Sequence, residues 1–280
     1  MKILKCTNCG LFANVNKVLR KSYRWYLKTG KKCKVIWPHS PYSSSSYSNT
    51  WEAFFKQPFQ ISKNKGFKTA LPAFFMTPRI RGKGGGPRNS LMIDPQDRGE
   101  GKKVINHFLE IHHKFYTKAK KFKKIYLKGS YIAVHARGPG RKHGATQFLK
   151  RHMKLTQGVP FWHYFKEIDK VLESYDNILI CSDAQLVIEA FKKKYGEKVV
   201  TYDAIRENRG EAHEKRAKGR IQTDGYKLGE DMIVEMLLMS TSDFFIHGNS
   251  NVSNFIRCFE PTLKCHNIFS PFYDNFTNDC

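Results

Sequence analysis

Arg137, in the segment VHARGPGRKHG, has the chemistry of a phosphate ligand. Its guanidinium stays charged and presents paired N–H donors that match two phosphate oxygens. The segment HGNSNVSNF places Asn249, Ser250 and Asn251 where we expect a strand to turn into a helix, and such a helix start favours anions. Together the two segments indicate a diphosphate site. A surface arginine, and a helix cap at Ser250 or Asn251, are the plainer alternatives.

Further polar groups follow the neighbouring expected strands. His135 ends one strand, and Asp183 follows another in CSDAQ. Asp231 and Glu235 are four residues apart in GEDMIVEMLLM, which places both on one face of a helix. A buried acid there could accept hydrogen bonds from a nucleobase or orient the arginine, and a solvated charged face is the alternative.

These residues depend on a regular alternation of strands and helices after Gly129. Such alternation predicts an α/β protein with a mostly parallel, doubly wound sheet, in which ligands bind at the carboxyl ends of the strands. A loop rich in charge and glycine is expected over residues 205–228. The expected strands are 131–136, 177–182, 199–202 and 243–247, and the expected helices are 161–175, 184–195, 230–239 and 251–259.

The N-terminal residues predict a separate βαβ unit. MKILKC is expected to form a strand, residues 14–27 a helix and residues 34–37 a second strand. Residues 99–124 are expected to form one long basic helix that leads out of this unit.

Charge is distributed unequally between the two halves. Residues 1–130 hold 28 Lys and Arg against five acids, whereas residues 131–280 hold 21 against 19. A basic half indicates a polyanion, a membrane surface or a phosphorylated ligand, with a merely solvated lysine-rich surface as the alternative. Aromatic residues alternate with lysines in KSYRWYLK and HHKFYTKAKKFKKIYLK, so a nucleic-acid-binding protein is the competing function.

Neither a membrane span nor a signal peptide is expected. No apolar run approaches the roughly 18 residues of a spanning helix, and the first ten residues lack the apolar core of a signal peptide. We therefore expect a cytoplasmic location and no membrane span.

Several segments, taken in order, resemble the fucosyltransferase-like superfamily, which includes α1,6-, nodulation and protein O-fucosyltransferases. VHAR, CSDAQ and GEDMIVEMLLMSTSDFFIHGNSNVSNF resemble its donor-binding half. CGLFANVNKVLRKSYRWYLKTGKKCKVIWP is similar to its opening segment, in which a loop precedes a helix and a strand that ends in proline. The resemblance covers about two thirds of the chain.

The resemblance implies a GT-B architecture, with two Rossmann-like domains that face each other across a cleft. Residues 1–128 would bind the acceptor, residues 129–262 would bind a nucleotide-sugar, and the tail 263–280 would pack back on the N-terminal domain. The reaction implied is an inverting, metal-independent transfer of a sugar to a hydroxyl of a glycan, without a cofactor. The partners are then a nucleotide-sugar donor and a glycan or glycopeptide acceptor, with no nucleic acid.

The resemblance also implies a role for individual residues. His135 would contact the base or ribose, Arg137 the diphosphate and Glu235 the base. Ser250 and Asn251 would contact the phosphate. The remaining residues expected at the donor site are Asp183, Asn249 and Asn14, the last in an N-terminal loop that faces the cleft.

Two departures from the family pattern leave the donor and the base open. H-A-R-G-P-G-R lacks the second adjacent arginine and the following acid of α1,6-type enzymes, and no acid occurs between residues 138 and 166. The donor could be GDP-fucose or UDP-xylose. The chain also looks like cytosolic glycosyltransferases of large algal viruses, which would favour a xylosyl donor and a location in the host cytoplasm.

The catalytic base must then come from elsewhere, and the N-terminal half has few acids. Asp94 and Asp97 in IDPQDRGEG rank first, followed by Glu52, with His143 as the candidate that is not a carboxylate. Nearby lysines should keep such an acid ionised, as a general base requires. A non-enzymatic glycan- or nucleotide-binding module, which would need no base, is a third possibility.

Overall fold

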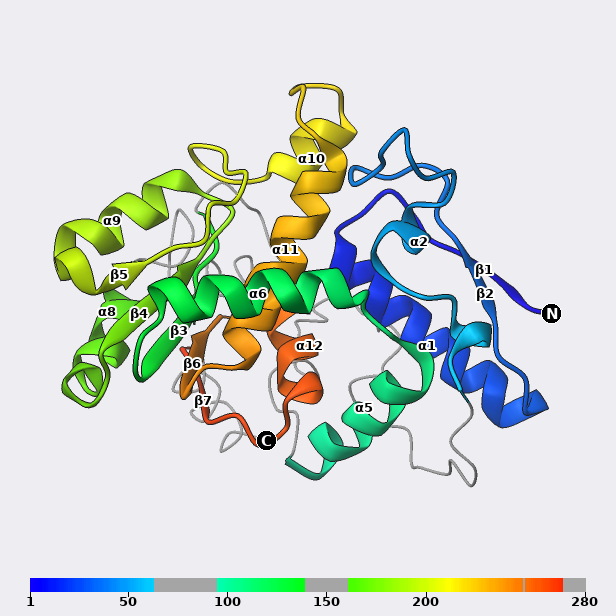
Figure 1. The fold of residues 1–280 in the computed structure, drawn as a ribbon, viewed down its shortest axis with the longest axis horizontal. Coiled ribbons are helices and arrows are strands. Elements are labelled where there is room, and N and C mark those ends of the chain that lie inside the picture. Colours follow the sequence, from blue (N-terminus) through cyan, green and yellow to red (C-terminus); the bar gives the residue numbers. More distant parts are fainter. Residues whose placement is uncertain (63–94, 139–160, 249, 269–280) are drawn as a thin grey trace, which may run out of the picture.

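The computed structural model describes residues 1–62, 95–138, 161–248 and 250–268 and contains two parallel sheets (Figure 1). The larger sheet has the strand order β5-β4-β3-β6-β7, and every neighbouring pair in it is parallel. Its strands are β3 (Tyr131–His135), β4 (Asn177–Cys181), β5 (Val199–Val200), β6 (Phe244–His247) and β7 (Cys265–Asn267). The predicted α/β class with a mostly parallel sheet is confirmed.

Other elements cover both faces of the larger sheet. Side chains along each strand point alternately to one face and the other, so each strand contributes to two layers of packing. Ile132 and Val134 of β3 pack with α8 (Phe161–Asp169) and α9 (Gln185–Tyr195). Tyr131 and Ala133 face the opposite way, into the main core that also contains residues of the N-terminal half. One continuous core therefore joins the N-terminal half to the sheet.

The N-terminal unit has the predicted βαβ order. β1 (Ile3–Lys5) and β2 (Lys34–Ile36) pair in parallel, with α1 (Leu11–Thr29) between them in the chain. A short helix α2 (Thr50–Phe54) and a single 3-10 turn η1 (Pro58–Gln60) follow. Figure 1 shows this unit on one side of the molecule and the larger sheet on the other.

Helix α11 (Gly225–Ser240) lies between the two halves together with α12 (Asn251–Phe259) (Figure 1). Phe54 of α2 stacks on Tyr226 of α11 with ring centroids 5.5 Å apart. A Cβ atom at Gly229 would lie 2.4 Å from the Phe54 ring, so the close approach of α2 to α11 requires glycine there.

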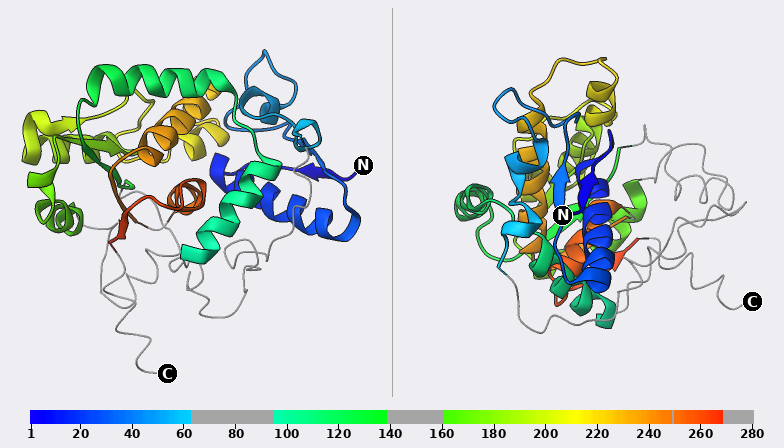
Figure 2. Two further views of the ribbon diagram at one scale, coloured as in Figure 1. Left: turned by 60° about the horizontal axis from the view of Figure 1, so that its bottom comes forward. Right: turned by 90° about the vertical axis from the view of Figure 1, so that its right-hand side faces the viewer.

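The predicted long helix over residues 99–124 is wrong, because two helices occupy that stretch. These are α5 (Pro95–Phe108) and α6 (His113–Tyr126). Between them the chain is extended and pairs with the end of α2: the Lys56 amide donates to Glu110 O, and the His112 amide donates to Phe54 O. Helix α6 does not lead away from the core but runs along α11. There, Nζ of Lys118 donates to the carboxylate oxygens of Glu230 at 2.7 Å. Figure 2 shows α6 on the outside of the molecule.

Two further elements were not predicted. Helix α10 (Ala212–Ala217) lies within the expected loop 205–228, and α11 begins before that loop was expected to end. Strand β7 lies within the expected tail 263–280 and pairs with β6, so this part of the tail belongs to the larger sheet and not to the N-terminal unit. Short 3-10 turns, η2 (Leu172–Ser174) and η3 (Gly196–Lys198), complete the described elements. The division at residues 128 and 262 stays a prediction.

Within the described residues, no helix combines the length and the apolar character needed to cross a bilayer.

Candidate functional site

A cavity of about 320 Å³ opens at the carboxyl ends of the central strands, between the two halves of the chain. We call it the strand-end cavity. The N-terminal half contributes the loop that leads into α1, and the other half contributes the ends of β3 and β4, the loop after β5, one face of α11 and the start of α12. Its polar lining residues are Cys9, His135, Arg137, Ser182, Asp183, Asp231, Glu235 and Asn251. The structure thus brings together most of the predicted donor-site residues.

Arg137 lies just after β3 and keeps its donors largely available. Its Nη2 lies 3.6 Å from Oδ2 of Asp183, and its Nε is buried without a hydrogen-bond partner among the described residues. Asp183 also accepts hydrogen bonds from the backbone amides of Gly138 (3.2 Å) and Glu211 (3.3 Å). Asp183 therefore fixes the turn that follows β3. It also orients Arg137, which can bind an anion in the cavity.

Gly138 allows this turn to pass close to its neighbours. A Cβ atom there would lie 2.5 Å from Arg209 O and 2.6 Å from the Ala184 side chain. The glycine after Arg137 in VHARG is thus required by packing and fixes where the arginine leaves the strand.

The start of α12 faces the same cavity. Ser250 is its N-cap: Oγ accepts from the Ser253 amide and the Ser253 side chain accepts from the Ser250 amide, so the plainer interpretation of Ser250 as a cap is confirmed. Ser250 Oγ also lies 3.3 Å from Nδ1 of His135. Asn251 lines the cavity, and the first-turn amides of a helix have no partner within it. The cap and an anion site can therefore coexist.

His135 is neutral at physiological pH. Burial lowers its pKa to about 4, only partly opposed by the Asp183 carboxylate. It can therefore exchange hydrogen bonds with a ligand without adding charge.

Glu235 lies in the cavity wall, in a buried ion pair. Arg206 Nη2 donates to Glu235 Oε1 at 2.9 Å, with side chains 8% and 13% exposed. The same guanidinium donates to the carbonyls of Ser182, Tyr202 and Ala204 at 2.7–3.2 Å. Burial raises the pKa of Glu235, and the Arg206 guanidinium opposes that shift and favours the carboxylate. Arg206 thus ties the end of β4, the loop after β5 and α11 together.

Sequence reasoning missed Arg206. It is one of four arginines in the expected loop 205–228, and nothing in their spacing distinguishes the one that pairs with Glu235.

Asp231 shares the cavity with Glu235, as the helical spacing predicts. Its Oδ2 accepts from the Ile205 amide at 2.9 Å, and the carboxylate also contacts Lys227. Asp231 is 2% exposed and its neighbour Glu230 is 5% exposed. The alternative of a solvated charged face is therefore wrong for these acids.

Asn14 is placed beneath the cavity wall. It lies in α1, which begins three residues earlier than expected, and it is fully buried. Its Oδ1 accepts from the Thr7 amide at 3.0 Å, and its Nδ2 donates to the carbonyls of Thr7 (2.9 Å) and Cys9 (3.4 Å). Asn14 thereby holds the loop at Cys9, Gly10 and Leu11, and it is this loop that lines the cavity.

Of the four candidate bases, Glu52 alone has a side chain in the described part of the chain. Glu52, on α2, accepts from Gln57 at 2.6 Å and from Asn49 at 3.2 Å, and it is absent from the cavity lining. Asp97 belongs to α5, but its side chain lies outside the described part, as do Asp94, His143 and Asn249.

The aromatic residues that favoured nucleic-acid binding are divided between the core and the surface. Tyr23 and Phe115 are fully buried, and Phe122 packs on Tyr202 with centroids 5.2 Å apart. Tyr116 and Tyr126 are exposed on α6, so two of the seven rings in these segments are open to solvent.

The cavity combines an arginine, a helix N-terminus and buried acids. The first two suit a diphosphate, and the acids suit a polar heterocycle. Within the described residues, no three or more metal-ligating side chains come together. Metal independence stays a prediction.

Three crystal structures of the α-1,6-fucosyltransferase NodZ are similar to this chain. The structure co-crystallized with GDP is 12% identical, covers 93% of this chain and 91% of that chain, and has a TM-score of 0.51. The structure soaked with GDP-fucose is 13% identical, covers 92% of each chain and also has a TM-score of 0.51. The selenomethionine structure from Bradyrhizobium is 15% identical, covers 94% of this chain and 91% of that chain, and has a TM-score of 0.52. No protein-family model matches the chain, and no curated protein matches it. The similarity shows that this chain has the GT-B-like fold of these structures, which confirms the predicted fold class.

Proposed function

We propose that this chain is a glycosyltransferase that binds a nucleotide-sugar in the strand-end cavity and transfers the sugar to a glycan hydroxyl. The observation that carries the proposal is the convergence of Arg137 with the start of α12 in one cavity between the two halves. The fold shared with NodZ, crystals of which were co-crystallized with GDP or soaked with GDP-fucose, supports the same conclusion.

Arg137 and the first turn of α12 stabilise the leaving nucleoside diphosphate. As the bond from the anomeric carbon to the phosphate oxygen breaks, negative charge grows on that oxygen and on the diphosphate. A guanidinium that Asp183 orients, but does not fully pair, can bind this charge, and the helix N-terminus adds amide donors. The neutral His135 beside Ser250 supplies a hydrogen bond at the same end of the cavity.

Glu235 and Asp231 define the nucleobase end. Arg206 occupies Oε1 of Glu235, which leaves the second oxygen to accept from a base N–H. A guanine edge, with adjacent N–H donors, suits such an acceptor, so GDP-fucose is our first choice of donor and UDP-xylose is the alternative.

The acceptor hydroxyl loses its proton to a base outside the cavity lining. The three carboxylates in the lining already contact Arg137, Lys227 or Arg206. Asp97 and Asp94 therefore stay the leading candidates. We expect inversion at the anomeric carbon and no requirement for a metal, so activity should survive EDTA.

A nucleotide-binding and turnover experiment tests the proposal. The melting temperature of the purified chain is measured with GDP, UDP and single-stranded DNA, followed by release of nucleotide from GDP-fucose and UDP-xylose. We expect one nucleotide to stabilise the fold. Arg137→Ala should abolish this shift and lower turnover by about 10²- to 10³-fold.

Arg220→Ala is the matched control, because Arg220 is exposed and lies outside the cavity lining. The proposal fails if neither nucleotide stabilises the chain, or if Arg137→Ala responds as the wild type does. Stabilisation by DNA alone would instead favour the nucleic-acid function.

A further inference from the structure

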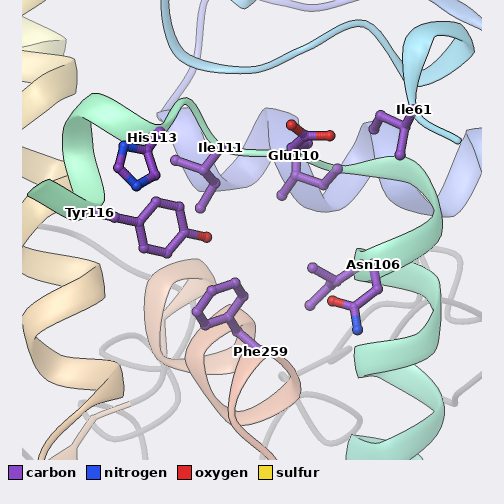
Figure 3. A pocket seen from close by; sticks show the side chains of 9 residues that line it. Ile61, Asn106, Glu110, Ile111, His113, Tyr116 and Phe259 are labelled. Carbon is purple, nitrogen blue, oxygen red and sulfur yellow. The ribbon is translucent and has the colours of Figure 1, made fainter.

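A second cavity, of about 410 Å³, opens where α5 ends and α6 begins (Figure 3). We call it the α5–α6 cavity. Phe259, the last residue of α12, lines it, whereas the first residues of α12 line the strand-end cavity. The nine residues of α12 span about 12 Å, so the two cavities lie at opposite ends of one short helix.

The α5–α6 cavity has an apolar floor and two aromatic walls. Ile105, Leu109 and Ile111 are buried and form the floor. The rings of Tyr116 and Phe259 border the space, and Figure 3 shows both turned toward it. Tyr116 is 39% exposed, so its ring is accessible to a ligand from solvent.

The polar groups around this floor are available to a ligand. The Asn106 amide and the Tyr116 hydroxyl form no side-chain hydrogen bond within the described part of the chain, and both residues line the cavity. Glu110 contacts Lys56 through one carboxylate oxygen. Burial, and to a smaller extent Glu110, raises the pKa of Tyr116, so its hydroxyl stays protonated and can both donate and accept. The rim therefore offers donors and acceptors side by side.

The walls are fixed by contacts that need no ligand. The buried Lys32 ammonium donates to Ile61 O at 3.0 Å and to His107 O at 2.9 Å, which joins the end of the N-terminal unit to α5. On the other side, Ile111 forms a bridge with Phe55. A preformed cavity loses less entropy when it binds a ligand.

The lining is poor in charge and holds one histidine, His113. No lysine or arginine lines the α5–α6 cavity, and Glu110 is its one acidic residue. A phosphate would thus meet the Glu110 carboxylate without the lysine or arginine that usually binds it. A neutral ring with hydroxyls on its edge and C–H groups on its faces matches both the polar rim and the aromatic walls, because the faces can stack on the rings.

We propose that the α5–α6 cavity is a carbohydrate-binding subsite that holds a sugar residue of the acceptor glycan, remote from the hydroxyl that reacts. The inference rests on the proposed function, which requires a glycan acceptor. A subsite at the far end of α12 positions a long acceptor and leaves the chemistry to the strand-end cavity. It predicts that longer glycans are better acceptors than their terminal monosaccharide.

Glycan binding by the full chain, without any donor, tests the subsite. The labelled protein is applied to an array of neutral and N-acetylated oligosaccharides, and the strongest ligand is titrated by calorimetry. Tyr116→Ala should weaken binding by roughly tenfold or more, because it removes one aromatic wall. Tyr126→Ala is the matched control: this tyrosine is exposed on the same helix, outside the cavity, and its loss should leave binding unchanged.

Nucleotide binding separates failure of the subsite from failure of the proposed function. Tyr116→Ala should bind the nucleotide as the wild type does, and Arg137→Ala should lose the nucleotide but keep the glycan. The subsite is overturned if no glycan on the array binds, or if Tyr116→Ala binds as tightly as Tyr126→Ala. If the wild type binds glycans through Tyr116 but binds no nucleotide, the cavity is a carbohydrate site, and the transferase proposal falls together with the acceptor role of that site.

Discussion

The hydroxyl of Ser250 lies 3.3 Å from Nδ1 of His135, a residue 115 positions earlier in the chain. The contact exists because β3 and β6 are neighbours in the sheet, with His135 and His247 in register at their carboxyl ends. Ser250 therefore has two roles at once, as the cap of α12 and as a contact of His135, which lines the strand-end cavity.

These two roles can be separated by comparing two helix caps. Ser250→Ala and Asp224→Ala each remove an N-cap side chain, and each should lower the free energy of unfolding by about 1 kcal/mol. Only Ser250→Ala should also weaken nucleotide binding, measured by calorimetry. Equal affinities in the two variants would remove Ser250 from the donor site.

Arg206→Ala should be severely destabilising. It leaves the buried Glu235 carboxylate without its partner and three carbonyls without a donor, and loss of one member of a buried pair costs about 3–5 kcal/mol. Urea unfolding measures the loss. Lys103→Ala, which breaks an exposed pair with Glu100, should cost less than about 1 kcal/mol.

A second substitution identifies the origin of that cost. Glu235→Leu in the Arg206→Ala background removes the unpaired carboxylate and should recover part of the lost stability. If it recovers nothing, the carbonyl contacts of Arg206 and not the ion pair account for the effect.

Asn14→Ala should loosen the loop at residues 7–11. The substitution removes part-buried hydrogen bonds to Thr7 and Cys9, which are worth about 0.5–1.5 kcal/mol each. Because this loop lines the strand-end cavity, the dissociation constant for the nucleotide should rise. Thr29→Ala, at the other end of α1, removes an exposed hydrogen bond and should leave the affinity unchanged.

Acid should destabilise the protein partly through His247. This side chain is 1% exposed, and burial lowers its pKa to about 3 from the usual 6.5. Between these values the unfolded chain binds the proton and the folded chain does not, so stability falls as the pH falls below 6.5. From pH 7 to 5.5 the loss from this histidine should be roughly 1 kcal/mol.

Comparison with His247→Gln isolates this contribution. Burial raises the pKa of Glu235, so this group stabilises the fold as the pH falls, whereas His247 destabilises it. The pH dependence of the stability of the wild type is therefore a sum of opposing effects. The variant should lose about 1 kcal/mol less than the wild type over the same pH interval. Parallel profiles would show that His247 does not contribute.

The sequence predicted what depends on local pattern. The bounds of α12 were predicted to the residue, because a small polar cap precedes an amphipathic run. The predicted strand-end residues His135, Arg137 and Asp183 do line one cavity, because parallel strands end at the same edge of a sheet. Asp231 and Glu235 were likewise placed together by their helical spacing.

The remaining features could not be predicted because they depend on packing between residues that are distant in the sequence. No glycine or proline marks the break between α5 and α6, because the break results from pairing with residues 54–56 rather than from a weak helical sequence. Strand β7 is only three residues long and has no alternating pattern of its own. Arg206 and Asn14 hold loops in place by donating to backbone carbonyls. Every residue has such a carbonyl, so the sequence does not mark these partners.

The strand order sets when the sheet can form during synthesis. The amide of Tyr131, at the start of the central strand, donates to the carboxylate of Asp243, 112 residues later. Until β6 leaves the ribosome, one edge of β3 has no partner, and β7 follows only at residues 265–267. Such late, distant pairing slows folding and leaves an apolar strand edge exposed in the nascent chain. The central strand of this half therefore completes its pairing only after more than a hundred further residues have been made.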